Sequence, residues 1–159
     1  MPALRQALNV SGHLMKTLLT LWMFLIFGQN CFAQIDRIDS LINQLDNFQV
    51  GLNGDYSGPT IDLRGEPSIS IYNIGRSATE KLIAILEDSS KGIISHILLT
   101  WIWNKSHSLK TVFSDQGNLS VYTYNDLNFF VRPGRIYANG YDLRLNRLNW
   151  ETFIRQNGR

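Results

Sequence analysis

The stretch Ile93–Trp103, IISHILLTWIW, is the most apolar segment downstream of residue 34, and it contains neither glycine nor proline. Its apolar residues fall at i, i+1, i+4, i+5, i+8 and i+9, and others cover the remaining side. A helix that is apolar on nearly every side is a buried helix. Because a bilayer needs about 20 apolar residues, the stretch is too short to span one. We therefore predict that it forms the central helix of the core.

Composition places one globular domain around this helix. The chain has 159 residues, of which 44% are hydrophobic and 18% charged, a balance typical of folded proteins. Its formal charge is +2, but without residues 1–33 it has 13 basic and 13 acidic side chains and a net charge of zero. A neutral chain has no electrostatic reason to bind nucleic acid.

Residues 1–33 are predicted to be a secretory signal peptide. Arg5 and Lys16 form a positive beginning, residues 17–27 (TLLTLWMFLIF) an apolar run, and residues 31–33 (CFA) a small-residue cleavage site. Residues 31–34 (CFAQ) resemble the leader ends of many exported bacterial proteins. We expect cleavage after Ala33 and a periplasmic or secreted product that lacks cysteine. The alternative is an uncleaved membrane anchor.

Two segments precede the central region. Residues 35–48 are predicted to form an amphipathic helix, with these apolar residues on its inner face: Ile35, Ile38, Leu41, Ile42, Leu45 and Phe48. Residues 50–67 are rich in glycine and proline and are predicted to be a long loop, with at most a short strand at residues 60–63. A calcium site of Asp55, Asp62 and Glu66 is an alternative, although their spacing does not match the EF-hand pattern.

Residues 68–104 carry a family resemblance. Residues 68–74 fit a helix or a strand, and Ser77 with Glu80 has the spacing of a capping box. The pattern I-x-x-I-G-x-x-A-x-x-x-L-I-x-x-L-x-D over residues 71–88, followed by Ile93, Ile94 and Ile102, resembles a HEAT-type helical repeat. The resemblance implies an antiparallel helical hairpin whose second helix is capped by Asp88. One partial repeat does not make a solenoid.

The pattern changes after residue 110. Short runs rich in aromatic and β-branched residues predict strands at residues 111–114, 119–124, 129–132, 135–138 and 141–145. Asn139–Gly140 has the composition of a type I′ turn, although residues 141–145 could instead open the last helix, predicted at 149–156. We predict one α+β domain over residues 34–159, with an N-terminal helix, a HEAT-like hairpin, a small antiparallel meander and a C-terminal helix.

The sequence contains no catalytic or metal-binding motif. A lone histidine inside the most apolar helix, as His96 is, belongs to the core, and His107 lies in a turn-like stretch far from it. We expect a protein that is not an enzyme and has neither metal nor cofactor. The alternative is a small envelope hydrolase that uses His96 or His107 with a carboxylate.

The predicted sheet carries the candidate binding residues. Arginine and tyrosine are over-represented at binding hot spots, and the selected residues are Tyr122, Tyr124, Arg132, Arg135 and Tyr137. We expect an exported, non-catalytic interaction domain with an unknown protein or envelope partner. A periplasmic immunity-type inhibitor of a toxin is one form of it. A membrane is a partner only through an uncleaved leader.

Overall fold

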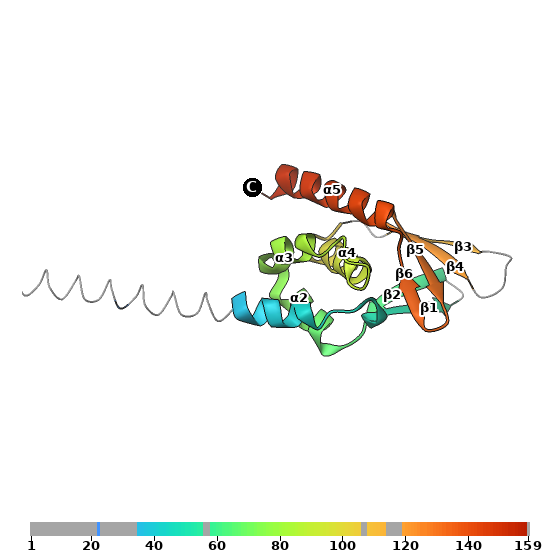
Figure 1. Cartoon of the computed structure of the whole chain (residues 1–159), viewed down its shortest axis with the longest axis horizontal. Coiled ribbons are helices and arrows are strands. Elements are labelled where there is room, and N and C mark those ends of the chain that lie inside the picture. Colours follow the sequence, from blue (N-terminus) through green and yellow to red (C-terminus); the bar gives the residue numbers. More distant parts are fainter. Residues whose placement is uncertain (1–21, 23–34, 56–57, 106–107, 114–118, 159) are drawn as a thin grey trace, which may run out of the picture. The chain divides into compact units, whose positions relative to one another are not determined.

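The computed structural model describes residue 22 and residues 35–55, 58–105, 108–113 and 119–158 (Figure 1). The chain divides into two units, Met1–Arg37 and Ile38–Arg159, and the second is the subject below. The predicted signal peptide and its cleavage site lie outside the described residues, Trp22 apart. Within the described part of the chain, no helix is both long and apolar enough to cross a bilayer.

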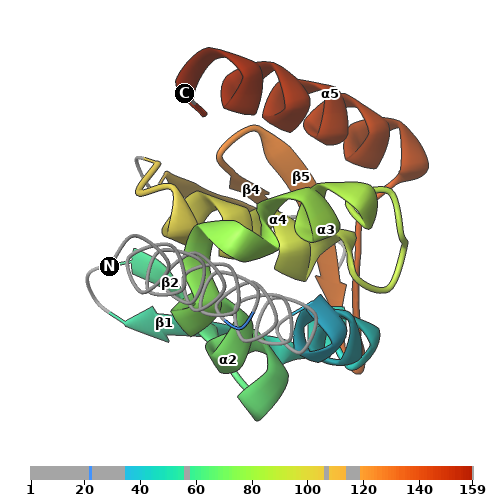
Figure 2. The ribbon, with the colours of Figure 1, turned by 90° about the vertical axis from the view of Figure 1, so that its left-hand side faces the viewer.

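Helix α4 (Gly92–Ile102) is the centre of the core, as the sequence predicts. Every residue from Gly92 to Thr100 is buried. In Figures 1 and 2, α5 (Gly140–Asn157) runs along one side of α4, and α2 (Glu66–Ile74) lies on the opposite side. The short helix α3 (Thr79–Ala84) packs against α4 and α5. The buried central helix and the α+β class are therefore confirmed.

The first amphipathic segment is shorter than predicted. Residues 35–43 are helical, and a 3-10 turn, η1 (Asn47–Gln49), follows. Four of its predicted inner residues are buried in the core: Ile38, Leu41, Ile42 and Leu45. Phe48 is 60% exposed, because the helix ends before it and the 3-10 turn directs it to solvent.

Asn47 caps the central helix from 46 residues away. Its side-chain Oδ1 accepts hydrogen bonds from the backbone N–H groups of Ile93 and Ile94, both at 3.1 Å. Its Nδ2 donates to the Ser89 carbonyl at 3.0 Å, and its own N–H donates to Ser90. Asn47 therefore satisfies the orphan donors at the start of α4 that the sequence assigned to Asp88.

Two local predictions between residues 74 and 92 are wrong. Ser77 does not form a capping box, since α2 continues into a 3-10 turn, η2 (Gly75–Ala78), and α3 begins without a side-chain cap. Asp88 binds the N–H and hydroxyl of Ser90 and therefore shapes the turn before α4. The resemblance to a HEAT-type repeat stays a prediction.

The glycine-rich segment predicted as a long loop at residues 50–67 instead contains a β-hairpin and the first residues of α2. Strands β1 (Val50–Asp55) and β2 (Gly58–Leu63) pair antiparallel in register from Val50↔Leu63 to Asp55↔Gly58. The glycines do not prevent pairing here. Gly51 stands opposite Asp62, whose carboxylate occupies the space that a β-carbon at position 51 would need. A hydrogen bond from the Asn53 side-chain amide to the Asp62 carboxylate also links the two strands.

The C-terminal strands form the predicted antiparallel meander. Strands β3 (Leu109–Phe113), β4 (Ser120–Tyr124), β5 (Leu127–Arg132) and β6 (Arg135–Tyr137) follow one another in space as in sequence. Leu127 and Phe129 of β5 are buried, and β5 contacts both α4 and α5. Side chains alternate along a strand, so Asn128, Phe130 and Arg132 form an outer face that points away from the core, whereas Val131 packs against the core with Leu127 and Phe129.

The position of the type I′ turn and the start of the last helix differ from the prediction. Asn125 and Asp126, between β4 and β5, have φ of 44° and 72°, as a type I′ turn requires. Asn139 instead caps α5, accepting at 2.8 Å from the N–H of Asp142. The predicted strand at 141–145 is thus wrong and the helical alternative is right. Helix α5 begins at Gly140, nine residues before the predicted start at Asn149.

Candidate functional site

His96 lies in the core with both ring nitrogens occupied. Its Nε2 lies 2.8 Å from the carbonyl of Tyr124, and its Nδ1 accepts a hydrogen bond from the Trp150 indole N–H at 2.9 Å. Since the indole can only donate, Nδ1 carries no proton and Nε2–H donates to Tyr124. Helix α4 supplies the histidine, β4 the acceptor and α5 the donor. This arrangement ties the three elements together around a neutral ring.

Burial lowers the pKa of His96 to about 4, and its hydrogen bond to Tyr124 offsets this only in part. The side chain is 1% exposed. A general base needs a nitrogen that can reach a substrate, and neither nitrogen of His96 is available. His107 lies outside the described residues. The geometry therefore gives no support to a hydrolytic role for His96.

Two of the predicted binding residues, Tyr122 and Tyr124, lie on the core side of the sheet. Tyr124 is 3% exposed, and its hydroxyl accepts from the Trp101 indole N–H at 2.9 Å. Tyr122 is half-buried and stacks on Phe129 at a centroid distance of 5.5 Å. Both side chains hold the sheet against the helices. Neither tyrosine therefore belongs to the outer face of the sheet.

The other three predicted residues, Arg132, Arg135 and Tyr137, lie together on the outer face. Arg132 pairs with Arg135 across β5 and β6, and Phe130 pairs with Tyr137 one step along the same face. The rings of Phe130 and Tyr137 stack at 5.3 Å with an angle of 22°. We call these four residues the arginine–aromatic face. Phe130 is the member that the sequence analysis did not select.

The two guanidinium groups of this face are held over the Tyr137 ring. The Arg135 guanidinium carbon lies 4.9 Å from the ring centroid, and that of Arg132 lies 6.0 Å from it. Both arginines are exposed, and no carboxylate of the described residues pairs with either of them. The face thus presents two neighbouring cations beside an aromatic ring.

A tight turn fixes the spacing of these cations. Only Pro133 and Gly134 separate Arg132 from Arg135. Gly134 has φ of +72°, a left-handed value that glycine adopts at no steric cost and that a type II turn needs at this position. The two-residue connection makes the arginines direct cross-strand neighbours.

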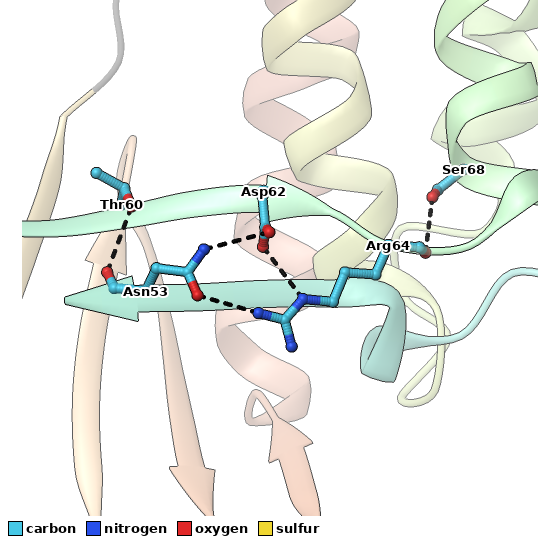
Figure 3. A network of polar contacts seen from close by, with 5 residues as sticks. All are labelled: Asn53, Thr60, Asp62, Arg64 and Ser68. Atoms are coloured by element: carbon cyan, nitrogen blue, oxygen red, sulfur yellow. Dashed lines mark hydrogen bonds and ion pairs between the residues drawn. The ribbon is translucent and has the colours of Figure 1, made fainter.

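The β1–β2 hairpin carries a second polar group, which is internally paired (Figure 3). The Asn53 amide donates to Asp62 at 3.2 Å and accepts from Arg64 at 3.1 Å, and Arg64 Nε lies 3.4 Å from Asp62. Asp62 is thus committed to neighbours within the hairpin. Among the described residues, no three histidine, cysteine or acidic side chains gather as a metal site.

Two apolar surfaces also reach solvent. Tyr141, Leu145 and Leu148 form an exposed stripe on α5, at 67%, 44% and 59% exposure. A groove of about 300 Å³ lies between the β1–β2 hairpin, the end of α4 and the sheet, lined by Pro59, Thr60, Ile61, Trp101, Leu109 and Tyr124. Neither surface carries charges that would select one class of partner.

Comparison with known proteins identifies no relative: no family model, no curated protein and no solved structure matches the chain. The site is therefore defined by its own geometry.

The residues that sequence reasoning missed act through long-range contacts. Asn47 caps a helix far along the chain, and Trp150 completes the histidine network. Phe130 is different, because its position two residues before Arg132 on a strand places both on one face. That alternation is a signal present in the sequence.

Proposed function

We propose that the chain is an exported, non-catalytic binding domain whose interaction surface is the arginine–aromatic face. Its partner is a protein or another component of the cell envelope, and an immunity-type inhibitor that blocks a toxin is one concrete form. The proposal for export depends on the leader-like residues 1–33.

One observation carries the binding role: two exposed arginines sit side by side over an aromatic ring without a carboxylate partner among the described residues. Like charges directly opposite each other in a sheet are destabilising. The contacts of both guanidinium groups with the Tyr137 ring do not neutralise their charge. A bound partner that neutralises both arginines accounts for this pair.

The test is capture from an envelope fraction by the immobilised full chain and two matched variants. Arg132→Ala with Arg135→Ala removes the cations of the face. Arg144→Ala with Arg155→Ala removes the same charge from exposed positions of α5. We expect one partner to be retained by the wild type and by the α5 variant and lost by the face variant.

Equal capture by all three proteins would show that the face is not the binding surface. Capture lost equally in both variants would show that net charge, and not this face, holds the partner. Unfolding in urea, followed by tryptophan fluorescence, establishes that each variant is folded before its capture is compared.

A further inference from the structure

The charged groups that the arginine–aromatic face presents to a ligand are two neighbouring guanidinium groups. Arg132 and Arg135 are directly paired across β5 and β6, two strands of one hairpin. Each guanidinium offers a planar fork of N–H donors that matches a carboxylate in a bidentate arrangement. Two such forks side by side can hold one carboxylate between them or one carboxylate each.

The aromatic rings of the face are already engaged, which bears on the class of ligand. Phe130 stacks on Tyr137, and both guanidinium groups lie over the Tyr137 ring. Stacking of a sugar needs an open ring face, and the Tyr137 ring is already in contact with Phe130 and with both guanidinium groups. The exposed charged groups of this face are two guanidinium groups, which favour an anionic ligand over the face of a sugar.

The distribution of charge along the chain supports an acidic partner. Residues 34–88 have nine acidic and four basic side chains, and residues 89–159 have four acidic and nine basic ones. The face belongs to the basic half. Complementary charge steers an acidic partner to such a region and raises the association rate.

We infer that the ligand of this face is an acidic protein segment that places carboxylates against Arg132 and Arg135. The inference rests on the proposed function, which it deepens by assigning a chemical class to the partner. Tyr137 and Phe130 act as the support that keeps both guanidinium groups at the surface.

The experiment measures binding of a fluorescently labelled hexaglutamate peptide to the full chain by anisotropy, at low and at physiological salt. The face variant is Arg132→Gln with Arg135→Gln, and the matched control is Arg144→Gln with Arg155→Gln. We expect the face variant to lose about tenfold in affinity and the control less than about twofold. Arg132→Lys with Arg135→Lys keeps the charge and should still weaken binding several-fold, because the fork is lost.

Three results would overturn the inference: no binding of hexaglutamate by the wild type, equal losses in the face variant and the control, or tighter binding of a trigalacturonate probe than of hexaglutamate. The third result would make an acidic polysaccharide the partner. If one of these results is obtained while capture from the envelope fraction still requires Arg132 and Arg135, the proposed function stands and only the inferred class of ligand is wrong. Capture that ignores the face would remove the proposed function itself.

Discussion

The neutral histidine at the centre of the fold makes stability depend on pH. His96 has a pKa of about 4 in the folded chain against 6.5 for an unperturbed histidine. Below pH 6.5 the unfolded chain binds a proton that the folded chain does not. Folding is therefore weakened as the pH falls from about 6.5 to about 4, and the loss levels off below that.

The magnitude follows from the two pKa values. Each pKa unit between the two states corresponds to about 1.4 kcal/mol. The separation between 6.5 and about 4 gives a loss of about 3 kcal/mol, with a slope of about 1.4 kcal/mol per pH unit in that window. Since small domains have only about 5–15 kcal/mol of stability, the effect is large enough to measure.

The assay is urea unfolding of the full chain at several pH values between 7.5 and 4, followed by tryptophan fluorescence. The His96→Gln variant is the comparison, because an amide does not titrate in this range. His107→Asn serves as the control, because it removes any contribution of His107 to the pH dependence of the free energy of unfolding and retains His96. We expect the control to keep the slope and His96→Gln to lose it.

A wild-type chain whose free energy of unfolding is flat between pH 6.5 and 4.5 would refute the reasoning. So would a His96→Gln variant with the same slope as the wild type. A flat curve would mean that the pKa of His96 is not lowered in the folded chain, and an unchanged slope in His96→Gln would mean that groups other than His96 cause the pH dependence.

The remaining predictions concern the packing of the helices, and urea unfolding at neutral pH measures all three. Asn47→Ala removes the side-chain acceptor of two buried N–H groups at the start of α4 and should cost about 2–4 kcal/mol; a loss below about 0.5 kcal/mol would contradict the cap. Gly92→Ala and Gly140→Ala should act in opposite directions: at Gly92 the new methyl group would overlap the Leu86 carbonyl and cost about 1–3 kcal/mol, whereas at Gly140 it meets open space and should stabilise by up to about 1 kcal/mol. Equal signs would contradict that packing. Leu143→Ala should cost about 2–4 kcal/mol and Leu148→Ala less than about 0.5 kcal/mol, because only Leu143 faces the core; the reverse order would mean that α5 is rotated.

The parts of the fold predicted from sequence are those with a local cause. The apolar run at residues 93–103 is buried wherever it packs, so its pattern alone indicates the central helix. The meander follows from short β-rich runs separated by turn residues. Each helix or strand in these two regions has its own signal within about ten residues of sequence.

The parts that were missed depend on competition between segments. Asn139–Gly140 suits both a type I′ turn and the start of a helix, and the outcome is set by α5 behind it, which buries Leu143 and Trp150. The β1–β2 hairpin pairs two glycine-containing segments whose side-chain network forms only once they meet. Asn47 has no cap signal of its own, since the helix that it caps begins far along the chain.

Each candidate residue faces either the core or the solvent, depending on whether the connections between strands have an odd or an even number of residues. This could be predicted from the sequence. Tyr122 and Tyr124 precede a connection of two residues in the structure, where a four-residue one was predicted. Either number is even, so either register places both tyrosines on the face of Phe129 and away from Arg132. Two further residues, Pro133 and Gly134, keep Arg135 and Tyr137 on the face of Arg132 and Phe130. Because both connections have an even number of residues, Tyr122 and Tyr124 lie on the core face and the two arginines on the outer face in either register. Amino-acid composition alone cannot make this distinction.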